Sequence, residues 1–252
     1  MQLDILDNIR IVLVATTHPG NIGAAARAMK TMGIKKMDLV TPKTFPCAEA
    51  TALAAGADDV LSNARVHEDL QSAIRGCAYI LGTSARARSI AWPVVQPEHA
   101  TRQVLELAGT CGADAAVIFG RESAGLSNEE LEACNAVIEI PANPEFSSLN
   151  LAAAVQLVCY ELRKTAIAIA VATDADMEAE ADEPPLASAD QMNLFYQHLQ
   201  QYLTEIDFYD PEKPRLLMRR LKRLFNRSRI DQNEYNILRG ILTAGQKAIK
   251  DR

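Results

Sequence analysis

The sequence predicts an α/β fold with a mostly parallel sheet, followed by a small helical domain. Two observations support this fold class. From Ile9 to about Ala170, short β-branched runs alternate with helical patterns. After residue 190, apolar residues recur only at helical spacing. Alternation of strands and helices is typical of parallel sheets, because each parallel connection needs a crossover segment.

Five apolar runs are expected to form the strands. Each is nearly continuous in apolar character, as is typical of strands covered on both faces. They are "IRIVLVA" (9–15), "KMDLV" (36–40), "AYILGT" (78–83), "AAVIFG" (115–120) and "AVIEI" (136–140). The sequence predicts helices between them, over 21–33, 67–75, 97–109, 127–134 and about 149–170.

Charge divides the chain into three parts. Residues 1–170, the predicted α/β domain, carry a net charge of −4. Residues 171–190 hold seven acids, no base and few bulky apolar side chains, so we expect an acidic flexible linker. Residues 191–252 carry +5 and are expected to form a basic helical extension.

The extension is predicted to contain three helices. They cover "SADQMNLFYQHLQQYLTEI", "PRLLMRRLKRLFNRS" and "DQNEYNILRGILTAGQKAIK". The second is amphipathic and strongly basic, which fits a solvated face, an RNA-phosphate surface or a membrane-surface helix. We favour RNA, because the basic residues are not interleaved with acidic partners. Its candidate RNA-binding residues are Arg219, Arg220, Lys222, Arg223 and Arg227.

Composition and missing motifs argue against several classes of protein. No run approaches the ~20 apolar residues of a membrane span, and "MQLDILDNIR" has acids where a signal peptide has bases, so we expect a cytoplasmic protein without a membrane partner. The five scattered cysteines lack a C-x-x-C pair, so neither a disulfide nor a metal site is expected. Neither G-x-G-x-x-G nor G-x-x-x-x-G-K-[ST] occurs, which disfavours dehydrogenases and P-loop enzymes.

Four segments that follow predicted strands have unusual compositions. They are "THPGNIGAAARAM", "GTSARAR", "FGRESAGLSNEEL" and "PANPEFSSLNLAAA". Ligands of open α/β sheets bind beyond the carboxyl ends of the strands, which is where these segments lie. Each also has a plain structural interpretation as a turn, a helix cap or a solvated ion pair.

Taken in order, these segments resemble the motifs of the SPOUT class of S-adenosylmethionine-dependent RNA methyltransferases. The resemblance is closest to the TrmJ-type tRNA 2′-O-ribose methyltransferases and covers the α/β domain essentially end to end. It implies a C-terminal trefoil knot in that domain, S-adenosyl-L-methionine as cofactor, and a homodimer that shares the active site. The implied substrate is the ribose 2′-hydroxyl at position 32 of the tRNA anticodon loop.

The resemblance also implies roles for particular residues. The implied catalytic residues are Asn21, Arg27, Glu122, Ser148 and Asn150. The implied cofactor-binding residues are Thr83, Ser84, Ala85, Gly120, Arg121, Glu122, Gly125, Ile140, Ser147, Ser148 and Leu149. Arg86 and Arg88 join the basic residues of the extension as candidate RNA-binding residues.

Arg27 stands alone on a helix of small residues. A guanidinium with a pKa above ~12 makes a poor general base. The hypothesis is therefore that Arg27 binds the phosphate beside the target ribose and orients the hydroxyl, while water or a phosphate oxygen takes the proton. We expect Asn21 to cap this helix, and the small residues from Gly23 to Ala26 to admit a partner subunit or RNA. The rivals are a non-catalytic RNA-binding protein and a dinucleotide-dependent oxidoreductase.

Overall fold

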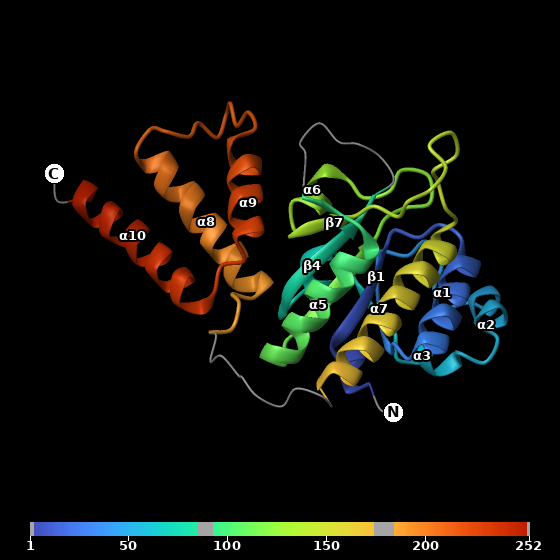
Figure 1. Ribbon diagram of the computed structural model, residues 1–252. Helices are drawn as coiled ribbons and strands as arrows, with labels where there is room; N and C mark the ends of the chain where they lie inside the picture. The colour runs from blue at the N-terminus through green and yellow to red at the C-terminus, as the bar shows by residue number, and fades with distance from the viewer. Residues whose placement is uncertain (1–2, 85–92, 174–183, 251–252) are drawn as a thin grey trace.

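The protein folds around a seven-stranded sheet, shown in the computed structural model of Figure 1. The structure describes residues 3–84, 93–173 and 184–250, so Ala85, Arg86 and Arg88 lie outside the described residues. The strand order is β3-β2-β1-β6-β4-β7-β5, and all of these pairs are parallel. The strands are β1 (Ile9–Val14), β2 (Lys36–Val40), β3 (Arg65–His67), β4 (Cys77–Thr83), β5 (Val94–Val95), β6 (Asp114–Phe119) and β7 (Ala136–Ile138).

Helices cover both faces of the sheet. On one face lie α1 (Pro19–Met32), α5 (Pro97–Cys111), α7 (Leu151–Thr173) and the 3-10 helix η1 (Asp4–Asn8). The opposite face packs against α4 (Leu70–Ala73) and α6 (Asn128–Leu131). Along β1, Ile11 and Leu13 face the first layer, whereas Val12 and Val14 face the second. This two-sided burial is why the strands have continuous apolar sequences.

The five predicted strands are confirmed, but β3 and β5 were not predicted. These two edge strands have only three and two residues, and their side chains are exposed or half-buried. His67, predicted to begin a helix, instead ends β3. Its ring nitrogen Nε2 lies 2.6 Å from the buried carboxylate of Asp38 on β2. The helix that follows begins at Leu70, because Asp69 accepts a hydrogen bond from the backbone N–H of Ser72 and caps it.

The small residues of α1 pack within the chain. α2 (Ala48–Ala54) lies directly against α1 and α3 (Asp58–Ser62) lies beside it, as Figure 1 shows. A Cβ atom at Gly23 would lie 2.0 Å from the carbonyl oxygen of Ala50, so only glycine fits at this contact. Ala25 and Ala26 are fully buried in the core. The expectation that this stretch admits a partner subunit or RNA is therefore wrong for Gly23, Ala25 and Ala26.

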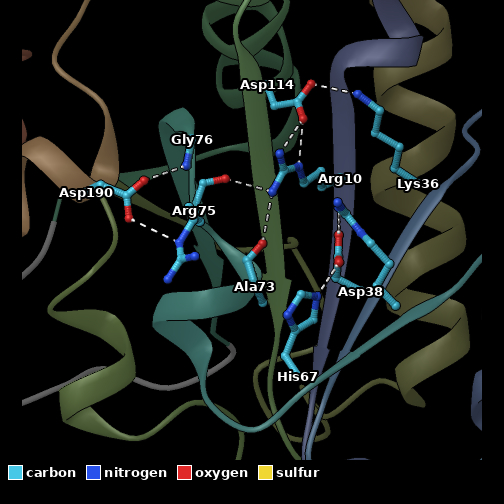
Figure 2. Close-up of polar contacts among 10 residues, drawn as sticks. Arg10, Lys36, Asp38, His67, Ala73, Arg75, Gly76, Asp114 and Asp190 are labelled. Carbon is cyan, nitrogen blue, oxygen red and sulfur yellow. Dashed lines mark hydrogen bonds and ion pairs between the residues drawn. The ribbon is translucent and has the colours of Figure 1, made fainter.

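A polar cluster joins the amino ends of three strands, as Figure 2 shows. The Nε atom of Arg10 on β1 donates to Asp114 on β6 at 2.7 Å, and the Nζ atom of Lys36 on β2 donates to the other oxygen of the same carboxylate at 2.7 Å. Arg10 also donates to the backbone carbonyl of Ala73 at 3.1 Å. These contacts pair the partly buried charges and hold the amino ends of the strands together. Ligands of such sheets bind at the opposite edge, beyond the carboxyl ends of the strands.

The C-terminal part of the chain forms a helical unit with its own apolar cluster. It comprises α8 (Ala189–Glu205), α9 (Leu217–Ser228) and α10 (Gln232–Lys250). Phe195 and Phe225 pack edge to face, with ring centroids 4.9 Å apart, inside this cluster.

The helices on either side of the predicted linker extend into it. Helix α7 continues to Thr173, beyond the predicted start of the linker, and helix α8 starts before the predicted end of the linker. The domain boundaries and the trefoil knot stay predictions.

Candidate functional site at the carboxyl edge of the sheet

A pocket lies at the carboxyl ends of three neighbouring strands, β4, β6 and β7. We call it the carboxyl-edge pocket. It spans about 780 Å³ when the open solvent at its mouth is included. Its lining residues are Thr83, Ser84, Phe119, Gly120, Arg121, Glu122, Ser123, Ala124, Gly125, Ile138, Ile140, Ser147, Ser148, Leu149, Leu151 and Ala154.

The pocket brings together every predicted cofactor-binding residue that the structure describes. Of the predicted set, only Ala85 lies outside the described residues. Sequence reasoning missed Phe119 and Ile138, which end strands, and Leu151 and Ala154 on α7. From the sequence, these apolar side chains are expected to be buried in the core. Their place beside the pocket depends on the pairing of β4 with β6 and β7, which the sequence does not show.

The loop after β6 forms a tight wall of the pocket. Arg121 and Gly125 exchange two backbone hydrogen bonds, of 3.2 and 2.8 Å, and Gly125 has a φ of 68°. A Cβ atom at Gly120 would lie 2.1 Å from the backbone carbon of Gly125. The two glycines are therefore needed for the closure of the loop itself.

The side chain of Arg121 is held outside this loop by α6. Its guanidinium makes two hydrogen bonds, of 2.9 and 3.0 Å, to the carboxylate of Glu130. Glu130 also completes a capping box with Ser127 at the start of α6. Arg121 therefore lines the pocket while its charge is used to join the loop to α6.

Glu122 ties together two segments of the site. One carboxylate oxygen accepts from the backbone N–H of Thr17 at 3.1 Å and from its hydroxyl at 3.0 Å. The other accepts from the backbone N–H of His18 at 3.1 Å and from the side-chain amide of Asn21 at 2.9 Å. The loop after β6 is thereby fixed to the start of α1.

This hydrogen bonding keeps Glu122 ionised. Burial raises the pKa of the Glu122 carboxyl, but hydrogen bonds from Asn21 and from backbone N–H groups lower that pKa to about 2. A carboxylate with so low a pKa, and with four donors already on its oxygens, is poorly suited to accept a proton near neutral pH. The geometry supports a positioning role for Glu122.

Asn21 and Asn150 extend this network to α7. The side-chain amide of Asn150 donates to the side-chain oxygen of Asn21 at 3.0 Å. The oxygen of Asn150 accepts from the backbone N–H groups of Ala152 at 2.9 Å and Ala153 at 3.2 Å, so Asn150 caps α7. The expectation that Asn21 caps α1 is wrong, because the cap position is His18 and the side chain of Asn21 is bound to Glu122 and Asn150.

Replacing Glu122 by glutamine is expected to destabilise the fold by about 2 kcal/mol at neutral pH, a value reduced for partial solvent screening. Glutamine presents an NH₂ group to donors and leaves some of them unpaired. Because folding lowers the pKa from its usual 4.5 to about 2, the stabilisation is complete above about pH 5 and is lost as the pH falls towards 2. Denaturant unfolding of both proteins across this range checks it, and a constant difference would contradict it.

Arg27 lies apart from the pocket of its own chain. It is exposed on α1, and its guanidinium has no hydrogen bond or ion pair among the described residues. Six helical residues place it about 9 Å along the axis and about 120° around it from Asn21. Of the five predicted catalytic residues, Glu122 and Ser148 line the pocket, Asn21 and Asn150 adjoin it, and Arg27 does not.

The candidate RNA-binding residues of α9 fall into two groups. Arg219 and Lys222 contact the carboxylate of Glu132, which follows α6, at 2.5 and 3.3 Å. Arg220 and Arg227 are exposed and Arg223 is half-buried, and their guanidinium groups make no ion pair with described residues. The structure therefore does not present these five side chains as one surface.

The described residues lack two kinds of feature. Among residues 3–84, 93–173 and 184–250, no helix combines the length and apolar character needed to cross a membrane. The same ranges contain no group of three or more His, Cys, Asp and Glu side chains arranged to hold a metal ion.

Known proteins share both the pocket segments and the helical unit. The chain matches the SpoU rRNA Methylase family over residues 8–160 and the C-terminal domain of tRNA methyltransferase TrmJ over residues 190–252. The tRNA (cytidine/uridine/adenosine-2′-O-)-methyltransferase TrmJ of Pseudomonas aeruginosa is 50% identical, over 97% of this chain and 96% of that protein. The tRNA (cytidine/uridine-2′-O-)-methyltransferase TrmJ of Pectobacterium atrosepticum is 48% identical, over 96% and 98%.

A solved structure has the same overall architecture. The crystal structure of TrmJ from Z. mobilis ZM4 matches with a TM-score of 0.80 and 33% identity, over 93% of this chain and 97% of that chain. The fold is therefore that of a SpoU-type methylase. Within that class, the chain belongs to the TrmJ family.

Proposed function

We propose that the protein methylates the ribose 2′-hydroxyl at position 32 of the tRNA anticodon loop, with S-adenosyl-L-methionine as methyl donor. The observation that carries the proposal is the carboxyl-edge pocket, whose lining residues all lie within the part of the chain that matches the SpoU rRNA Methylase family. Identity of 50% to a curated TrmJ over nearly the whole chain supports the same reaction. A tRNA-modifying role fits a protein that works in the cytoplasm.

The residues that line the pocket suit the chemistry of the cofactor. Hydroxyl groups of Thr83, Ser147 and Ser148 suit the polar ends of the cofactor, and the apolar side chains of Ile138 and Ile140 suit a flat adenine ring. When bound, the cofactor supplies an activated methyl group on a sulfonium, so the protein's main tasks are placement and proton removal.

Neither Glu122 nor Arg27 is proposed to take the proton of the 2′-hydroxyl. Glu122 holds its proton only at very low pH, and a guanidinium is protonated at any working pH. Arg27 instead binds the phosphate next to the target ribose and fixes the orientation of the hydroxyl. Water or a phosphate oxygen then takes the proton as the hydroxyl attacks.

The proposed enzyme is a homodimer whose active site combines two copies of the chain. The support is the position of Arg27, which is exposed on α1 and does not line the pocket of its own chain. A second copy that packs against α1 brings its pocket to this arginine. Each site then contains Arg27 from one chain and the carboxyl-edge pocket from the other.

Incubation with S-adenosylmethionine and unmodified tRNA is expected to yield one new 2′-O-methylated nucleoside, located at position 32. Mass spectrometry of the digested tRNA detects the nucleoside and identifies its base. A tRNA carrying a 2′-deoxy residue at position 32 is the matched control and is expected to stay unmodified. Cofactor binding without any methylated nucleoside would indicate the rival, an RNA-binding protein that has this fold without the activity.

A further inference from the structure

Helix α9 carries basic side chains on two neighbouring faces. Arg219, Lys222 and Asn226 are spaced three and four residues apart and share one face, which we call the docking face. Arg220, Arg223 and Arg227 have the same spacing one residue later, about 100° around the helix, and form what we call the outer face. The apolar residues Leu221 and Phe225 pack into the helical unit. The two basic faces are therefore separate surfaces of one helix.

The docking face is bound to the α/β domain of the same chain. Arg219 and Lys222 hold the two oxygens of the Glu132 carboxylate, whose side chain is only 15% exposed. Asn226 is buried and donates to the backbone carbonyls of Glu132 at 3.0 Å and Cys134 at 3.3 Å. The backbone carbonyl of Asn226 accepts a hydrogen bond from the side-chain amide of Asn135 at 3.0 Å. Such a set of paired and partly buried groups fixes an orientation.

A second contact joins the start of α8 to the α/β domain. Asp190, in the first turn of α8, accepts from the backbone N–H of Gly76 at 3.0 Å and lies 3.8 Å from the guanidinium of Arg75 (Figure 2). Gly76 precedes β4 and Glu132 follows α6, so the helical unit contacts two segments of the α/β domain. Together these contacts hold the helical unit against that domain.

The docking face also lies next to the wall of the pocket. Glu132 directly follows α6, the short helix whose Glu130 holds the Arg121 side chain of the loop after β6. The outer face differs: Arg220 and Arg227 are exposed, Arg223 is half-buried with its Nε atom buried, and none of the three guanidinium groups has an ion-pair partner among the described residues. Charges that lie unpaired on one surface suit the phosphates of a nucleic acid.

We propose that the two faces have different partners: the docking face positions the extension on its own α/β domain, and the outer face binds tRNA phosphates. The inference rests on the proposed function. Under this inference, Arg219, Lys222 and Glu132 are positioning residues that set how bound tRNA is aligned with the pocket. Arg219 and Lys222 were predicted to bind RNA, and the inference gives them this positioning role instead.

Glutamine variants of adjacent arginines test the proposal. Arg220→Gln is expected to weaken tRNA binding and to lower the salt slope of the binding constant by about 0.7–0.9, the contribution of one phosphate contact. Arg219→Gln, its matched partner one residue earlier, is expected to leave that slope unchanged and to lower kcat about tenfold, because misaligned substrate reacts slowly. Glu132→Gln is expected to have the same effects on salt slope and kcat as Arg219→Gln. The double variant Arg219→Gln/Glu132→Gln is expected to lower kcat no further than either single change does.

Three outcomes overturn the proposal. One is a fall in salt slope for Arg219→Gln equal to that of Arg220→Gln. Another is an unchanged or raised kcat for Glu132→Gln, since a raised value would mean that docking inhibits the enzyme. The third comes from X-ray scattering without RNA, where Glu132→Gln is expected to increase the radius of gyration and an unchanged radius would count against docking. Failure of the wild-type protein to methylate tRNA would instead refute the proposed function.

Discussion

Replacing Arg27 by alanine is expected to lower methyl-transfer turnover by on the order of 10²–10³-fold, the typical cost of losing one charged group that stabilises a transition state. The affinity for S-adenosylmethionine is expected to stay the same, because Arg27 is exposed on α1 and does not line the described pocket. Single-turnover kinetics with tRNA and calorimetry with the cofactor measure the two quantities separately. A loss of cofactor affinity would show that Arg27 supports the pocket rather than the substrate.

The conservative variant Arg27→Lys examines how the phosphate is held. A planar guanidinium binds phosphate through two parallel hydrogen bonds, whereas an ammonium acts as a point charge. Turnover well below the wild-type value is therefore expected. Near-normal turnover would contradict two-point binding.

Mixed dimers test whether the site is shared. Arg27→Ala is combined with Ser148→Trp, a variant designed to block the pocket. Random exchange at equal amounts makes half of the dimers mixed, and each mixed dimer has one intact site, so about a quarter of wild-type activity is expected. No recovery in a mixture shown to have exchanged subunits would place Arg27 and the pocket of one site in the same chain.

Replacing Gly120 by alanine is expected to abolish cofactor binding at concentrations that saturate the wild-type protein. The new Cβ would lie 2.1 Å from the carbon and 2.5 Å from the oxygen of Gly125, and both are backbone atoms that cannot rotate away. The loop between these glycines has to open, which breaks its paired hydrogen bonds and destabilises the fold by about 1–3 kcal/mol. Calorimetric titration with S-adenosylmethionine and thermal unfolding measure the two effects.

A glycine in the helical unit provides the matched control. Gly240 lies within α10, and a Cβ added there meets nothing within 4 Å. Gly240→Ala is therefore expected to leave cofactor binding unchanged and to stabilise the protein slightly, by about 0.5–1 kcal/mol. Equal loss of cofactor binding in both variants would mean that the effect of Gly120→Ala is not local to the pocket.

Much of the fold could be predicted because its strands are buried on both faces. Continuous apolar runs mark β1, β2, β4, β6 and β7 in the sequence. The short edges β3 and β5 have no such run, since two or three half-exposed residues produce no periodicity. Helices α2 and α3 were also missed, because at seven and five residues they are too short for a clear helical repeat.

Part of the pocket's lining could be predicted, but its geometry could not. Motif resemblance selected many of the residues that line the pocket and missed others, such as Phe119 and Ile138, and it contains no information on which side chain contacts which. The glutamate at position 122 illustrates this limit: a solvated ion pair with its neighbour Arg121 was one interpretation of the segment, whereas the structure pairs Glu122 with residues about a hundred positions earlier. The partner of Arg121 is Glu130 instead. Such long-range pairing depends on strand order, which composition does not encode.

The central position of β1 also affects how the chain folds during synthesis. Ile9 on β1 pairs with Ala115 on β6, so the first strand completes its hydrogen bonds only after about a hundred further residues have been made. At roughly 5–20 residues per second, β1 leaves the ribosome several seconds before this partner does. Its apolar edge can be bound by a chaperone or by another nascent chain during that interval. Premature release of the chain before Phe119 is thus expected to yield an aggregation-prone fragment.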